Sequence, residues 1–155
     1  MQTTPPVVDY SKKWLVLSAV SMGIFLATID GSIVNISLPT LVHAFKTDFA
    51  LVQWVVLSYL LTVTTLVLGV GRPADIYGKK RIYTAGFIVF TLGSVLCGFS
   101  PTIQALIGFR VVQAVGASMI MALGMAIVTE AFPGSERGRA LGITGTIVSV
   151  GIALG

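Results

Sequence analysis

Charged residues are scarce in this sequence. They make up 10% of its 155 residues, whereas a soluble domain carries about a quarter. A soluble chain of this length has too much surface to cover with so few charges, which argues against a soluble globular enzyme. With 55% hydrophobic residues the chain is not disordered, and it lacks the alternation typical of membrane β-barrel strands. An α-helical membrane protein remains, since helices satisfy their own backbone polar groups in lipid.

Reactive side chains are equally rare. Cys97 is the single cysteine and lies in an apolar block, so it forms no internal disulfide and we expect it to serve in packing. We find no metal-ligand cluster and no nucleophile constellation, and we expect no metal, no cofactor and no enzymatic activity. Residues 69–74 faintly resemble a dinucleotide fingerprint, but they follow a long apolar run rather than a strand.

Long apolar blocks dominate what is present. A polar tail at residues 1–13, expected to be cytoplasmic, precedes blocks at about 14–38, 50–71, 82–99, 102–132 and 140–155. A helix needs about 20 residues to cross a hydrocarbon core of roughly 30 Å, and the first four blocks suffice. The sequence stops inside the fifth block, which we interpret as an incomplete span. We therefore expect a partial N-terminal bundle of four to five transmembrane helices in a lipid bilayer.

The net charge of +4 comes from short basic clusters between these blocks, which is a topology signal and not evidence for nucleic acid. Eight basic residues fall on one side if four spans separate the tail from the last loop: Lys12, Lys13, Arg72, Lys79, Lys80, Arg81, Arg137 and Arg139. The opposite loops carry only Lys46. The positive-inside rule then predicts a cytoplasmic N-terminus and a multi-pass protein of the cell membrane.

Two ionisable residues lie inside apolar blocks. Asp30 follows an apolar stretch of the first block, and Arg110 lies within the fourth. A charge there costs at least about 2.5–3.5 kcal/mol on insertion scales, so each should face a partner or a cavity. We expect an ion pair or a shared cavity; a polar span end for Asp30 and snorkelling for Arg110 are the structural alternatives. Gln113 shares a helix face with Arg110.

A charged segment at residues 71–81 separates the second and third blocks. Pro73 and Gly78 punctuate it, Asp75 lies among cations, and we interpret it as a hinge or as a plain positive-inside anchor. Glu130 closes the fourth block on the same side, so salt bridges between the two cytoplasmic turns are possible. The chain also has 17 glycines, some spaced for close helix packing, including Gly151 and Gly155.

Three motifs resemble the major facilitator superfamily of transporters. Residues 71–81 resemble the signature G-x-L-A-D-R-x-G-R-K, with Gly71, Ala74, Asp75, Gly78, Lys79 and Lys80 matching and with departures at Pro73 and Ile76. Residues 106–116, which include Arg110, Gln113 and Gly116, resemble L-x-x-x-R-x-x-Q-G-x-G. Residues 29–39, which include Asp30 and Asn35, resemble L-D-x-T-I-V-N-V-A-L-P, a pattern of the drug:proton antiporter branch with fourteen spans.

The resemblance implies roles for the matching residues. Asp30, Asn35, Arg110 and Gln113 would lie along the path of protons and substrate. A conformational gate on the cytoplasmic side would comprise Gly71, Asp75, Gly78, Lys79, Lys80 and Glu130, while helix packing would involve Gly116, Gly151 and Gly155. Spans one and four would be counterparts in inverted repeats.

The sequence thus predicts proton-coupled multidrug efflux of small amphipathic or cationic compounds, seen in an N-terminal fragment whose missing C-terminal helices would be its partner. Two alternatives stay open. One is a metabolite uniporter or symporter of the same superfamily, because fold alone does not decide substrate or direction. The other is a truncated membrane protein that transports nothing.

Overall fold

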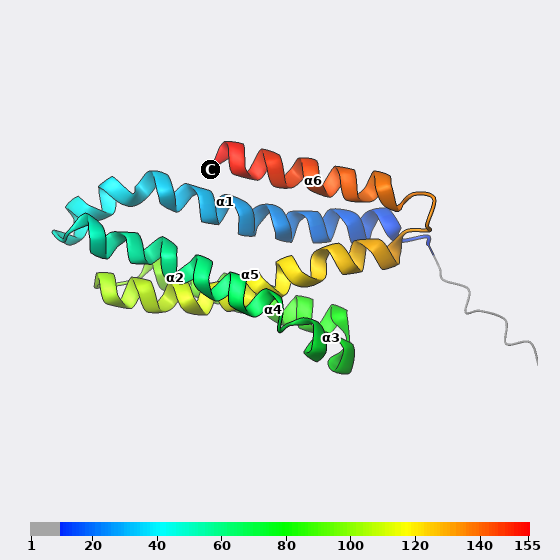
Figure 1. Ribbon diagram of the computed structural model, residues 1–155, viewed down its shortest axis with the longest axis horizontal. Coiled ribbons are helices and arrows are strands. Elements are labelled where there is room, and N and C mark those ends of the chain that lie inside the picture. Colours follow the sequence, from blue (N-terminus) through cyan, green and yellow to red (C-terminus); the bar gives the residue numbers. More distant parts are fainter. Residues whose placement is uncertain (1–9) are drawn as a thin grey trace, which may run out of the picture.

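The computed structural model describes residues 10–155, and all of the regular structure in that range is helical. The helices are α1 (Lys13–Phe45), α2 (Phe49–Val67), α3 (Gly71–Tyr77), α4 (Lys79–Gly98), α5 (Ile103–Ala131) and α6 (Arg137–Leu154) (Figure 1). Within the described range, α1, α2, α4 and α5 are long and apolar enough to cross a membrane. The predicted all-α membrane fold is confirmed.

Two helix boundaries differ from the sequence expectation. α1 continues through Pro39 and ends at Phe45, beyond the expected end near residue 38. Proline is tolerated inside membrane helices because neighbouring groups and waters can satisfy the backbone carbonyl that it frees. The expected 71–81 connection contains the short helix α3, and α2 ends at Val67 rather than near residue 71.

The long helices lie alongside one another in an elongated bundle (Figure 1). α1 begins at one end of this bundle, where α3 and the α5–α6 turn also lie, and we call this the basic end. The α1–α2 turn, which contains Lys46, lies at the opposite end, called the far end below. This arrangement gathers the eight basic residues as the sequence predicts.

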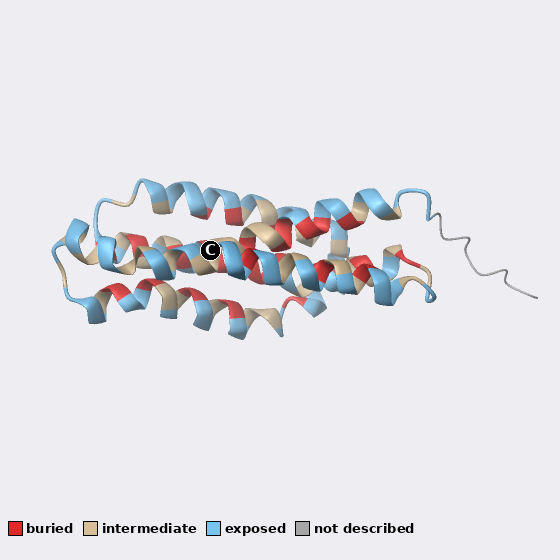
Figure 2. Ribbon diagram, turned by 90° about the horizontal axis from the view of Figure 1, so that it is seen from above, coloured by how far each residue is buried: buried red, intermediate tan, exposed pale blue. Residues whose placement is uncertain are grey.

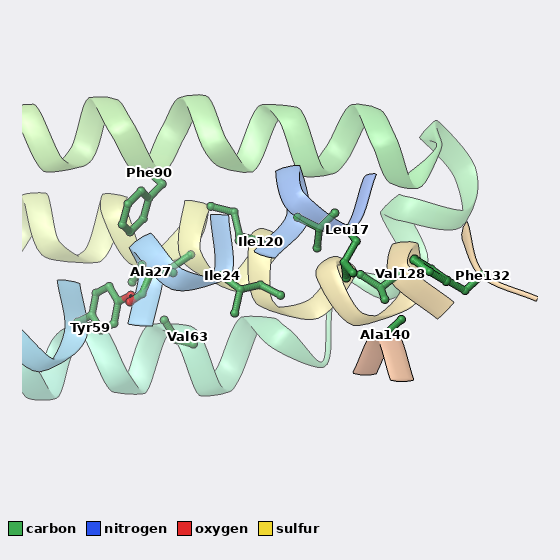
Figure 3. Packing of buried hydrophobic residues seen from close by; sticks show 13 residues of the cluster. Leu17, Ile24, Ala27, Tyr59, Val63, Phe90, Ile120, Val128, Phe132 and Ala140 are labelled. Atoms are coloured by element: carbon green, nitrogen blue, oxygen red, sulfur yellow. The ribbon is translucent and has the colours of Figure 1, made fainter. Parts of the chain in front are cut away.

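α5 forms the centre of the bundle and contacts α1, α2, α4 and α6. Its buried side chains join those of α1, α2 and α4 in one apolar cluster, shown in Figure 3. In Figure 2 buried residues follow the inner sides of the helices, and exposed residues lie on the outer sides. Many of the exposed residues are large and apolar, among them Met22, Leu61 and Leu92. Such a surface suits lipid rather than water.

Close backbone contact holds α4 against α5. A Cβ added to Gly93 would lie 2.7 Å from the Cα of Gln113, and one added to Gly116 would collide with the backbone of Phe90. Since only glycine leaves that space, the two helices approach closely at the level of Gln113. This packing presents Gln113 and Arg110 to the interior of the bundle.

Candidate functional site

Asp30 of α1 and the α5 residues Arg110 and Gln113 form a closed polar network inside the bundle. Arg110 Nη1 donates to Asp30 Oδ2 at 2.6 Å and to Gln113 Oε1 at 2.7 Å. Gln113 Nε2 donates to Asp30 Oδ1 at 2.9 Å. Both carboxylate oxygens therefore have donors. The sequence left an ion pair or a shared cavity open for Asp30 and Arg110. The structure shows both, because the two residues form an ion pair and also line one cavity.

Burial makes this network strongly interdependent. Arg110 is 3% exposed and Gln113 is 1% exposed, while the side chain of Asp30 is 20% exposed. Buried charges are tolerated only when they are paired and hydrogen-bonded, so the Asp30 carboxylate and the Arg110 guanidinium depend on each other and on the amide of Gln113. The Nε of Arg110 is buried and has no hydrogen-bond partner among the residues described.

Two further residues complete the surroundings of Arg110, and the sequence reasoning missed both as site residues. The guanidinium carbon of Arg110 lies 4.8 Å from the centre of the Tyr59 ring on α2, in cation–π geometry. The Tyr59 hydroxyl donates to the Ala27 carbonyl at 3.4 Å. Cys97 of α4, expected to serve in packing, has its Sγ 3.7 Å from Gln113 Oε1. The sequence signal that could have pointed to Tyr59 is a tyrosine in the middle of an apolar block.

A cavity of about 300 Å³ lies beside this network and is called the central cavity here. Its polar lining comes from Thr28, Ser32, Asn35, Tyr59 and Arg110, set among apolar residues of α1, α2, α5 and α6. The structure places Asn35 on this lining and outside the Asp30 network, with its amide donating to the Gly31 carbonyl at 3.3 Å. An apolar pocket with few polar groups is the usual form of a small-molecule site.

The expected gate residues lie at the basic end. Lys79, at the start of α4, forms an ion pair with Glu130, near the end of α5. Gly78 separates α3 from α4 with φ 93° and ψ 131°, a conformation that favours glycine. Asp75, Gly71 and Lys80 are exposed in the same region.

A second cluster at the basic end joins α1 to the α5–α6 turn. Lys13 forms an ion pair with Glu136, and the rings of Trp14 and Phe132 meet edge-on at 5.4 Å. Arg139 lies over Trp14, with its guanidinium carbon 5.6 Å from the ring centre. The expected salt bridge between the two cytoplasmic segments is therefore the Lys79–Glu130 pair, whereas Glu136 pairs with Lys13 at the start of α1.

The packing glycines Gly151 and Gly155 lie where α6 meets α1. A Cβ at Gly151 would lie 3.2 Å from Thr28 Cβ, and one at Gly155 would lie 2.9 Å from the Ile29 carbonyl oxygen. Their spacing puts both on one face of α6. Gly116 has the corresponding place on α5 against α4.

No group of three or more His, Cys, Asp or Glu side chains that could hold a metal ion occurs in the range 10–155.

Comparison with known proteins places this geometry in a family. The sequence pattern described as Major Facilitator Superfamily matches residues 20–155. The chain is 48% identical over 140 residues to the riboflavin transporter RibZ of Clostridioides difficile strain 630, covering 90% of the chain and 31% of that protein. It is 38% identical over 142 residues to the multidrug resistance protein Stp of Mycobacterium tuberculosis strain CDC 1551 / Oshkosh, covering 91% of the chain and 26% of that protein.

A third relative is the multidrug transporter protein MdtP of Bacillus subtilis strain 168, 31% identical over 145 residues, which cover 94% of the chain and 27% of that protein. The chain thus spans less than a third of the length of these relatives. The matched pattern, the membrane-spanning helices and the three sequence motifs all indicate the same family. The chain belongs to the major facilitator superfamily of transporters and is part of a multi-pass protein of the cell membrane.

Proposed function

We propose that the complete protein is a proton-coupled exporter of small amphipathic or cationic compounds, a drug:proton antiporter. The observation that carries this proposal is the Asp30–Arg110 ion pair at 2.6 Å between two membrane helices. An ionised side chain inside a membrane is costly, so such residues usually have a function. The partly buried Asp30 carboxylate has a cation partner that protonation would release. Relatives named as multidrug resistance and multidrug transporter proteins support the choice of substrate class.

The coupling follows from charge. With Asp30 ionised, the pair is neutral and holds α1 to α5. Adding a proton to a carboxylate oxygen leaves a neutral carboxylic acid beside an unpaired Arg110 guanidinium, and this changes the relative energy of the states that differ around the pair. Proton entry thereby favours one state and proton loss the other, so substrate release and proton uptake are linked.

The central cavity supplies the substrate site in this proposal. Its apolar wall suits an amphipathic body, and Asn35, Thr28 and Ser32 offer hydrogen bonds. Arg110 borders the same cavity, so a cation would be repelled while Asp30 is protonated and tolerated while Asp30 is ionised. Binding of the proton and binding of the cation therefore oppose each other, as the exchange of one for the other requires.

The basic end supplies the gate. Gly71, Asp75, Gly78, Lys79, Lys80 and Glu130 lie around the connection from α2 to α4. Exposed ion pairs such as Lys79–Glu130 are individually weak, so they can break and re-form during a conformational change. Gly78 adopts the positive φ of the turn between α3 and α4 without the strain that another residue would have there. We propose that this region helps to stabilise one of the alternating states.

The test is a transport assay on the complete gene product, because the chain spans less than a third of its relatives. Protein is reconstituted in vesicles with a fluorescent lipophilic cation, and a pH gradient is imposed in either direction. Accumulation driven by the gradient and abolished when an ionophore collapses it supports the proposal. Transport that ignores the gradient contradicts proton coupling, and no transport of any compound supports the non-transporting alternative.

A second candidate is transport of a metabolite such as riboflavin. The 48% identity to a protein named as a riboflavin transporter favours it. Competition in the same vesicles separates the two candidates. Saturable riboflavin uptake that the cation does not inhibit would favour the metabolite, and export of the cation that riboflavin leaves unchanged would favour the drug.

A further inference from the structure

Arg110 lies between two separate cavities. The central cavity borders one side of it, and a second cavity of about 220 Å³, called the side cavity here, borders the other. The polar lining of the side cavity comprises Asp30, Ser37, Ser94, Cys97, Arg110 and Gln113. Among these cavity linings in the described range, Arg110 belongs to both, whereas Asp30 and Gln113 belong to the side cavity.

We propose that the side cavity is the route by which water and protons reach Asp30, separate from the substrate site in the central cavity. This inference rests on the proposed function and assigns the two tasks to two spaces. It names Ser94 and Cys97 of α4 as residues that line the proton route. Arg110 is then the residue that borders both the proton route and the substrate site.

The lining supports a wet path. Ser94 and Cys97 lie near the end of α4 at Gly98, and Ser37 of α1 is half-buried. A volume of about 220 Å³ has room for several waters at roughly 30 Å³ each, and hydroxyl, thiol and amide groups give them partners. Ser37 and Leu41 extend the lining along α1 toward the far end, which is the external side by the positive-inside rule. The proposed exchange brings protons in from that side.

The charged and titratable groups around Asp30 fit a local proton exchange. Arg110 faces it from α5, Tyr59 of α2 packs on the far side of that guanidinium, and Cys97 of α4 contacts Gln113. Only Arg110 carries a permanent charge among these. A proton that arrives through the side cavity therefore meets one carboxylate. Once Asp30 is neutralised, the positive charge of Arg110 beside the central cavity is no longer compensated.

The experiment separates proton access from substrate binding in the complete protein. Substrate-triggered proton release is followed in detergent by stopped flow with a pH indicator, and the Kd of a fluorescent cation is measured in parallel. Ser94→Leu, which adds bulk to the lining of the side cavity, should slow proton release about tenfold or more and leave Kd within about twofold. Val56→Phe, which narrows the central cavity, should weaken Kd and leave the proton-release rate unchanged.

Matched variants keep the proposal falsifiable. Thr91→Leu adds similar bulk one turn away on the exposed side of α4 and should change neither quantity. If Ser94→Leu fails to fold, as judged by gel filtration, Ser37→Val replaces it with the same expectation. Unchanged proton release in the side-cavity variant, or equal loss of both quantities, overturns the separate route. Proton release that persists in Asp30→Asn overturns the proposed function itself.

Discussion

The carboxylate of Asp30 on α1 lies 2.6 Å from the guanidinium of Arg110 on α5, a residue 80 positions later in the sequence. Gln113 bonds to both members and closes the network. The pair links the first helix to the centre of the bundle. In the proposed function it is the place where the uptake of one proton changes the net charge of the interior.

Asp30→Asn tests the proton acceptor. Asparagine keeps the size and one carbonyl acceptor for Arg110, but it has no proton to gain or lose. We expect insertion to be retained and gradient-driven transport to be lost. Thermal stability should fall, because the buried Arg110 guanidinium loses its charged partner. Full gradient-driven efflux in vesicles by this variant would remove Asp30 from the mechanism.

Arg110→Ala leaves the Asp30 carboxylate without its cation. Breaking a buried pair by removing one partner costs about 3–5 kcal/mol, so we expect lower thermal stability in detergent as well as loss of transport. The charge-swapped double variant of Asp30→Arg with Arg110→Asp should recover part of that stability. A double variant no more stable than either single variant would contradict a direct pair energy.

Gly116→Val tests the close approach of α4 to α5. The added side chain would collide with the backbone of Phe90, and overpacking of this kind costs typically about 1–3 kcal/mol. Thermal unfolding in detergent should shift downward, whereas Gly142→Ala, at a position with open space around it, should have little effect. Equal melting of the two variants would show that the contact is not tight.

Gly78→Ala tests the turn between α3 and α4. An L-residue held at φ 93° is strained by about 1–3 kcal/mol, and the strain can be relieved by moving α3. We expect slower transport with substrate affinity retained, measured as a lower maximal rate at an unchanged half-saturating concentration. An unchanged maximal rate would argue against a gating role for this turn.

Lys79→Glu tests the exposed pair at the basic end. This variant places two acids together, and the reverse change Glu130→Lys places two lysines together. Both changes should therefore disfavour the conformation in which residues 79 and 130 are in contact. Because an exposed pair is worth about 0.2–1 kcal/mol, the effect should appear in transport rate rather than in stability. The double swap should restore the rate, and its failure to do so would indicate that the pair has no role in gating.

Much of the fold follows from local properties of the chain. Hydropathy and span length predict helices in a membrane, and the spacing of lysine and arginine predicts which ends lie together. Both signals are local or additive along the chain, so no knowledge of packing is needed. The three motifs likewise single out Asp30, Arg110 and Asp75 without any structure.

The contacts across helices could not be predicted in this way. The sequence left an ion pair and a shared cavity as alternatives for Asp30 and Arg110, and it assigned no role in the site to Tyr59 or Cys97. It predicted a bridge between the two cytoplasmic segments, which Lys79 and Glu130 form, but it did not predict the pairing of Glu136 with Lys13. Each of these outcomes depends on how four helices cross and how closely glycines let them approach.

Hydrophobic patterning, then, was enough to place the chain in a bilayer as helices, because burial in lipid is decided residue by residue. The division of the interior into a central and a side cavity, with Arg110 between them, was decided by tertiary packing alone. A cavity exists only where side chains from separate helices fail to fill the space between them, and no single helix carries that information.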